Sequence, residues 1–178
     1  MENKLWYERP AAIFTDALPF GNGSFGGMAY GGTAEDKITL NLDTLWSGTG
    51  TRQERQIQKE TLQRARELIF RGDYREADDF IRDHMLGFYN ESYMPLGTLL
   101  LEYEGIDNTS TESYRRTLDL EQAVITTSFA DRGRRIERQL FASFPQNAVF
   151  WKITCKGQGG ISLRMYLDSK LRHKCMAD

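Results

Sequence analysis

The sequence contains few of the side chains on which metal sites and nucleophilic triads depend. Its 178 residues include two histidines, His84 and His173, and two cysteines, Cys155 and Cys175. Neither pair has the C-x-x-C or H-x-x-x-H spacing of a zinc site, and two cysteines are too few for a disulfide framework. His84 falls on an apolar helical face, where a structural role is favoured over a catalytic one. We therefore expect no metal, no cofactor and no catalytic triad.

Strong charge of one sign and long apolar runs are also missing. The net charge is -2 without a basic stripe, which argues against nucleic acid as a partner. No apolar run approaches the roughly 20 residues of a membrane-spanning helix, so we expect no membrane partner. The first ten residues, MENKLWYERP, lack the apolar core of a signal peptide, so we expect a cytoplasmic protein, with a secreted parent as the alternative.

The segment GNGSFG, residues 21–26, matches the G-x-G-x-x-G fingerprint of dinucleotide-binding proteins, and Asp43 follows where that motif places its ribose-binding acid. The fingerprint requires a buried strand before it and a helix after it. Pro19 argues against a central strand before the glycines, and Gly31 and Gly32 would interrupt a helix after them. We therefore interpret the glycines as turn and close-approach residues of a β-rich fold.

Apolar and polar residues alternate along much of the chain, which is typical of strands with one buried face. After an irregular stretch at residues 1–23, we predict strands at 24–32 and 36–42 and a series of strands from residue 96 onward. The later strands include the segments YRRTLDL, AVITTSFA, RRIERQLFASF, AVFWKITC and ISLRMYLDS. Turn formers such as ADRG and KGQGG separate them. This spacing predicts a mainly β fold, an antiparallel β-sandwich.

The hydrophobic period becomes helical between these two groups of strands. Apolar residues recur at helical spacing from Ile57 to Ile69, and Gly72 is a typical helix end. Asp73 then has the character of a helix N-cap, with Glu76 three residues later as a capping-box partner. We predict an αα-hairpin at about residues 54–86, inserted into the sandwich.

The loop NLDTLWSG carries side chains suited to a sugar. Asn41 and Asp43 can hydrogen-bond hydroxyl groups, and the face of Trp46 can pack against the C–H groups of a sugar ring. The structural alternative is a core tryptophan with an Asx-turn that holds the loop. Together with Asn22 of the glycine loop, we name Asn41, Asp43 and Trp46 as candidate substrate-binding residues.

Five segments in this order resemble one family: LWYERPAAIFTDALPFGNGSFGGMAYGG, LNLDTLWSGTG, YMPLGTLLLEY, YRRTLDL and FASFPQNAVFWKI. From Leu5 to Ser169 the chain is similar to the N-terminal domain of glycoside hydrolase family 95, whose best-known members are inverting α-L-fucosidases, with some α-L-galactosidases. The resemblance implies a β-sandwich domain that precedes a catalytic (α/α)6 barrel. It therefore assigns no catalytic residue to this chain, which we expect to be a single, truncated N-terminal domain over residues 1–178.

The resemblance also implies a function. It implies a non-catalytic domain or fragment, inactive alone, that packs on the barrel and shapes a cleft for a fucosylated or galactosylated glycan. A free-standing carbohydrate-binding or interaction module is the alternative, and a complete small glycosidase using Asp43 is a second. A truncated sandwich would leave the apolar face of Ile161, Leu163, Met165 and Leu167 short of cover. We therefore expect a homodimer through an exposed sheet edge.

Overall fold

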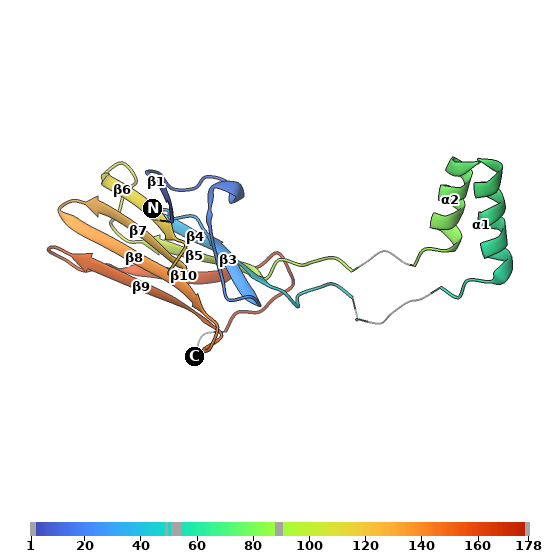
Figure 1. Cartoon of the computed structure of the whole chain (residues 1–178). Coiled ribbons are helices and arrows are strands. Elements are labelled where there is room, and N and C mark those ends of the chain that lie inside the picture. Colours follow the sequence, from blue (N-terminus) through green and yellow to red (C-terminus); the bar gives the residue numbers. More distant parts are fainter. Residues whose placement is uncertain (1–2, 49, 51–54, 88–90, 177–178) are drawn as a thin grey trace. The chain divides into compact units, whose positions relative to one another are not determined.

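The computed structural model of the chain describes residues 3–48, 50, 55–87 and 91–176. The chain forms two compact units (Figure 1). One, the sandwich unit, combines Met1–Leu45 with Met94–Asp178, and the other, the helical unit, is Trp46–Tyr93. The predicted mainly β fold with two antiparallel sheets and a helical hairpin is confirmed.

Two five-stranded sheets make up the sandwich unit, and all neighbouring strands in both sheets are antiparallel. Sheet A has the order β1 (Lys4–Tyr7), β6 (Thr111–Asp119), β7 (Val124–Asp131), β8 (Arg134–Ser143) and β9 (Ala148–Lys156). Sheet B has the order β10 (Leu163–Asp168), β5 (Gly97–Tyr103), β4 (Glu35–Leu42), β3 (Phe25–Ala29) and β2 (Leu18–Gly21).

The core lies between the two sheets and is made by every second residue of the central strands. Along β7 and β8 the buried positions alternate with partly exposed ones, as the period of two in the sequence predicts. Each fully buried aliphatic or phenyl side chain contributes roughly 1.5–3 kcal/mol to folding. The most deeply buried members are Leu18, Ile38, Leu101, Phe129 and Ile136.

The prediction of an irregular segment at residues 1–23 is wrong for two short strands. β1 and β2 each have four residues, and a single turn of 3-10 helix, Phe14–Asp16, lies between them. Such short strands show too few alternations to be recognised. Pro19 lies in β2, an edge strand that pairs only with β3. Proline is tolerated in an edge strand, because such a strand has a neighbour to hydrogen-bond on one side only.

The glycine segment forms a β-hairpin and is followed by no helix. Gly26 lies inside β3 and pairs with Gly21 of β2. A Cβ atom on Gly26 would lie 2.8 Å from the carbonyl oxygen of Phe20, and one on Gly27 would overlap the carbonyl oxygen of Thr39. The glycines therefore permit close strand approach, as we interpreted them from the sequence, and the absence of phosphate binding stays a prediction.

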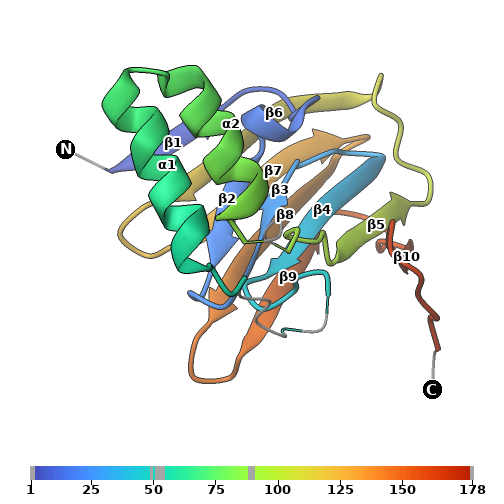
Figure 2. The same cartoon turned by 90° about the vertical axis from the view of Figure 1, so that its right-hand side faces the viewer.

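The helical unit contains two helices that lie side by side (Figure 2). They are α1 (Lys59–Arg71) and α2 (Tyr74–His84), within the predicted range of 54–86, whose first residue lies outside the described residues. Gly72 ends α1 in the left-handed conformation with φ of 84°, as predicted. Asp73 occupies the predicted N-cap position of α2, but its side chain makes no cap hydrogen bond, so the capping box is not formed.

One inward-facing row of sheet B lacks cover. Leu163, Met165 and Leu167 of β10 are in register with the core-facing residues of β5, yet they are 37%, 59% and 54% exposed. By contrast, their neighbours Leu101 and Tyr103 are 1% and 4% exposed. The expectation that this apolar face is short of cover is confirmed for Leu163, Met165 and Leu167 and is wrong for Ile161, which is partly buried and packs against the core.

Candidate functional site

Asn22 lies in the turn between β2 and β3, and its side chain is used by the fold. Its Oδ1 accepts hydrogen bonds from the N–H groups of Phe25 at 2.8 Å and Ser24 at 3.2 Å. Its Nδ2 donates to the carbonyl oxygen of Ser143 at 3.2 Å and to Oδ1 of Asn147 at 3.1 Å. Asn22 therefore closes its own turn and holds it against the turn between β8 and β9.

Asn41 and Asp43 lie near the same end of sheet B. Asn41 is on β4, in register with Gly26, and the N–H of Asp43 donates to the carbonyl oxygen of Ser24 at 2.9 Å. Asp43 is exposed, whereas Oδ1 of Asn41 is buried without a hydrogen-bond partner in the described part of the chain. The structure thus brings three of the four predicted residues, Asn22, Asn41 and Asp43, to one region.

Trp46 belongs to the helical unit, where it forms an isolated β-bridge with Tyr93. The two ring centroids are 5.0 Å apart with planes inclined at 56°. Trp46 is 53% exposed and Tyr93 is 44% exposed, so the structural alternative of a core tryptophan is wrong. An exposed, rigid aromatic pair of this kind can pack on a sugar face. That Trp46 joins the other three residues in one site stays a prediction.

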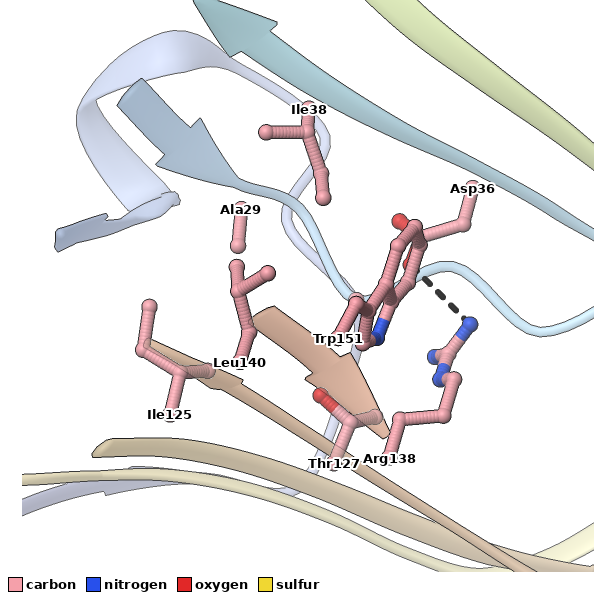
Figure 3. A pocket seen from close by; sticks show the side chains of 9 residues that line it. Ala29, Asp36, Ile38, Ile125, Thr127, Arg138, Leu140 and Trp151 are labelled. Carbon is pink, nitrogen blue, oxygen red and sulfur yellow. Dashed lines mark ion pairs between the residues drawn. The ribbon is translucent and has the colours of Figure 1, made fainter. Parts of the chain in front are cut away.

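A charged pair that the sequence reasoning missed is buried between the two sheets (Figure 3). Asp36 of β4 and Arg138 of β8 form an ion pair of 2.9 Å, with 7% and 2% of their surfaces exposed. Arg138 also donates to the hydroxyl of Tyr103 at 3.1 Å and to the carbonyl oxygen of Gly32 at 2.6 Å. Oδ1 of Asp36 accepts from the N–H groups of Gly32 and Lys37, both at 2.8 Å.

This environment shifts the pKa values of the groups that it contains. Burial raises the pKa of Asp36, while the charge of Arg138 and the N–H groups of Gly32 and Lys37 act against that rise. Burial also raises the pKa of the Tyr103 hydroxyl, although Arg138 opposes it. A carboxyl group with a raised pKa is a candidate general acid, so access to it decides whether it can serve as one.

Access to Asp36 is too narrow for a sugar. The adjacent cavity has a volume of about 10 Å³ and is lined by Asp36, Arg138, Thr127, Leu140 and Trp151, among others (Figure 3). That is the space of a single water, whereas small-molecule sites are typically 300–1,000 Å³. Nε of Arg138 is buried and has no hydrogen-bond partner among the described residues. The cluster therefore orders the interior and does not form a substrate site.

A second buried arginine, Arg116 of β6, holds the N-terminal segment in place. It is 1% exposed, and its Nε and Nη1 donate to the carbonyl oxygens of Arg9 at 2.8 Å and Asp16 at 2.7 Å. Its guanidinium lies over the ring of Tyr7, 4.2 Å from the centroid. Asp36, Arg116 and Arg138 all occupy inward positions of strands, next to Ile38, Leu118 and Leu140. A charge inside an alternating apolar row was the signal that could have revealed them.

The histidines and cysteines do not form part of a metal-ligand cluster. Among the described residues, no three His, Cys, Asp or Glu side chains lie close enough together to hold a metal ion. Nδ1 of His84 lies 3.0 Å from the carbonyl oxygen of Phe80, and its ring stacks on that of Phe80 at 4.4 Å. Cys155 packs at the edge of the core. No described helix is both long enough and apolar enough to cross a membrane.

Comparison with known proteins identifies the family. Residues 5–177 match the family model described as "Glycosyl hydrolase family 65, N-terminal domain". The chain is 33% identical over 172 residues to "Alpha-L-fucosidase 2" of Arabidopsis thaliana, an alignment that covers 96% of this chain and 20% of that protein. It is 29% identical over 160 residues to "Probable alpha-fucosidase A" of Aspergillus niger, covering 84% of this chain and 20% of that protein.

The resemblance to the N-terminal domain of fucosidase-like glycoside hydrolases is confirmed by these matches. The chain spans about a fifth of the length of the relatives that it matches. It belongs to the family of glycosyl hydrolase N-terminal domains.

Proposed function

We propose that this chain is a non-catalytic N-terminal region of a fucosidase-like glycoside hydrolase, which packs on the catalytic part of the same polypeptide and shapes one wall of its sugar cleft. The names of the relatives and the fifth of their length that the chain spans support this assignment. The sealed position of Asp36 supports it as well, because a general acid must reach the glycosidic oxygen.

The exposed inward row of β10 is the observation that carries the packing proposal. Leu163, Met165 and Leu167 lie on the core side of sheet B, where register places them beside buried residues of β5. Leaving such side chains in water forgoes roughly 1.5–3 kcal/mol each. Sequence from the remainder of the longer polypeptide is the occupant that we propose, since the relatives hold four-fifths of their length outside the matched region.

The sugar-facing role falls to the candidate residues near the end of β4. We propose that Asn41 forms hydrogen bonds with hydroxyl groups of a fucosylated or galactosylated glycan and that the carboxylate of Asp43 accepts them. In the helical unit, the exposed ring of Trp46 is available to stack on a sugar. Asn22 contributes indirectly, because its amide is already bound within the hairpin and to the β8–β9 turn. The exposure of Asp43 supports this role, whereas Oδ1 of Asn41 is buried and must become accessible before it can accept a hydrogen bond from a glycan.

A chromogenic α-L-fucoside assay on the purified chain tests the non-catalytic assignment. We expect no turnover above the rate without protein. Asp43→Asn is the matched variant, because it removes one carboxylate and keeps the shape of the side chain. Turnover by the chain that Asp43→Asn abolishes would contradict the proposal and favour a small complete glycosidase.

A free-standing carbohydrate-binding module is the second candidate, favoured by the exposed Trp46 and Tyr93 pair. Calorimetric titration with a fucosylated oligosaccharide distinguishes it. Submillimolar affinity of the isolated chain, lost in Trp46→Ala and kept in Phe70→Ala, would favour the module. Phe70 is a suitable control because it is an exposed aromatic of α1.

A further inference from the structure

A hollow at one end of sheet A combines ligand-sized space with three cationic lining residues, Arg134, Arg135 and Lys156. It has a volume of about 360 Å³, within the range of small-molecule sites. Its lining includes Ser113, Gly133, Arg135, Lys156 and Gly157, from β6, the β7–β8 turn, and the region where β9 ends. A Cβ atom on Gly157 would lie 2.8 Å from the carbonyl oxygen of Gly133, so the close approach of two turns shapes this hollow.

Arg135 and Lys156 are directly opposite each other in the β8–β9 ladder. Each alternates with a residue of the core, Ile136 and Cys155, so both side chains lie on the outer face of sheet A. Like charges at opposed positions of an antiparallel pair destabilise a sheet. The repulsion between Arg135 and Lys156 therefore destabilises the sheet unless an anion binds near both charges.

Within the described chain, neither Arg135 nor Lys156 has a carboxylate partner. Their neighbour Arg134, in contrast, pairs with the buried Asp131 and donates to the carbonyl oxygens of Gly105 at 3.3 Å and Gly160 at 3.4 Å. Glu137 follows Arg135 on the same face of β8, but it accepts a hydrogen bond from Gln139. The charge of Arg134 is therefore satisfied, and those of Arg135 and Lys156 are available to a ligand.

We propose that this hollow binds an oxyanion, a carboxylate, sulfate or phosphate group, between the guanidinium of Arg135 and the ammonium of Lys156. The planar guanidinium presents two parallel N–H donors to such a group, and the ammonium adds a compact charge. Ser113 also lines the hollow, and we propose its hydroxyl as a further donor. The oxyanion belongs either to a free inorganic ion or to an acidic sugar. The proposal does not depend on the fucosidase-like assignment.

Calorimetric titration of the chain with sulfate, phosphate and glucuronate, at constant ionic strength in chloride, tests this site. We expect binding of at least one of them, weakened about tenfold by Arg135→Gln and by Lys156→Gln, because each removes one charged hydrogen bond. Lys152→Gln is the matched control. Lys152 is an exposed lysine on the same face of β9 and does not line the hollow.

The melting temperature without oxyanions supplies a second measurement. We expect Lys156→Gln to raise it slightly, since the repulsion with Arg135 is relieved, and to reduce the increase that the oxyanion produces in the wild type. Tighter binding of glucuronate than of sulfate would identify an acidic sugar as the source, and the reverse order an inorganic ion. Equal binding in the wild type and all three variants, or glucose bound as well as glucuronate, would overturn the proposal.

Discussion

β4 and β10 flank β5 in the same sheet, and one row of residues across these three strands runs from Asp36 through Leu101 to Met165. The aspartate is 7% exposed, the leucine 1% and the methionine 59%. Hydropathy alone would give the opposite order for the two ends of the row. Burial in this molecule therefore follows the cover that the facing sheet provides, and not the character of the side chain.

The two ends of that row need different partners. Asp36 is tolerated inside because Arg138 and two backbone N–H groups meet its oxygens at 2.8–2.9 Å. Met165 requires only an apolar surface, which the described chain does not supply. The buried end is thus complete within the chain, whereas the exposed end lacks cover within the described residues.

The largest expected effect on stability comes from removing the ion pair between Asp36 and Arg138. Arg138→Met leaves Asp36 buried and unpaired, and we expect the free energy of unfolding to fall by about 3–5 kcal/mol. Urea unfolding followed by tryptophan fluorescence measures the change. Arg135→Met, an exposed position three residues earlier on β8, is the control, with an expected change of less than about 0.5 kcal/mol.

The double variant Asp36→Leu with Arg138→Met sharpens this test. It removes both charges, so we expect it to recover part of the stability that Arg138→Met loses, although Gly32 and Lys37 lose their acceptor. A double variant less stable than either single variant would show that the pair acts through its backbone hydrogen bonds and not through charge compensation.

The next largest effect concerns the close approach of β3 and β4 in sheet B. A Cβ atom on Gly27 would meet the ring of Phe20 at 2.8 Å and overlap the carbonyl oxygen of Thr39. We expect Gly27→Ala to cost roughly 1–3 kcal/mol, because β3 and β4 must separate. Gly160→Ala is the control, since no atom lies within 4 Å of its added Cβ. Equal melting temperatures for the two variants would contradict the observed strand spacing.

A third effect depends on pH. Burial raises the pKa of Asp131, but hydrogen bonds from Ser110 and Arg134 and nearby positive charge outweigh it, so the pKa is lowered from its ordinary value of 3.8. Its ionised form therefore stabilises the fold above pH 3.8, and that contribution is lost as the pH falls through the lowered pKa. We expect Asp131→Asn to reduce stability at pH 7, with a difference from wild type that shrinks in acid.

Urea unfolding at pH 7 and at several values below pH 4 measures this dependence. Asp78→Asn, on the exposed side of α2, is the control and should track the wild type throughout. A difference between Asp131→Asn and wild type that stays constant with pH would mean that the lost hydrogen bonds, and not the charge, carry the effect.

The sequence predicts the parts of the fold that repeat over many residues. Alternation over eight to ten residues identifies β4, β7 and β8, and the change of period identifies the helical hairpin. β1 and β2 were not predicted, because each has only four residues and therefore shows too few alternations between apolar and polar residues. The pairing of Asp36 with Arg138 was not predicted, because a pattern of apolar residues does not identify a charged residue that lies on the buried face of a strand.

The candidate site was predictable in residue type and only partly in role. The segment NLDTLWSG has side chains suited to a sugar by composition, but the structure places Asn41 on β4 and Trp46, which is exposed, in the helical unit. The role of Asn22 was not predictable, since its contacts with Ser143 and Asn147 join residues more than 120 positions apart. Only the packing of the two sheets brings those residues together.

The smallest expected effect on stability lies at the exposed end of the row, where the effect on association is large. Leu167 is 54% exposed, so we expect Leu167→Lys to change the free energy of unfolding of the monomer by less than about 0.5 kcal/mol. The isolated chain should use this face to associate with a second copy, because its own sheet leaves it bare. Light scattering at micromolar concentration should then give a dimer for wild type and a monomer for Leu167→Lys.

The control for association is Phe70→Lys, which places a lysine at an exposed aromatic of α1 and should leave the dimer intact. In a longer polypeptide that contains this chain, we expect another segment to cover that face. The longer wild type should therefore be monomeric, and Leu167→Lys should lower its melting temperature, because the lysine then disrupts a buried contact. A monomeric isolated wild type, with Leu167→Lys equally stable in both lengths, would show that the exposed row of β10 is not an interface.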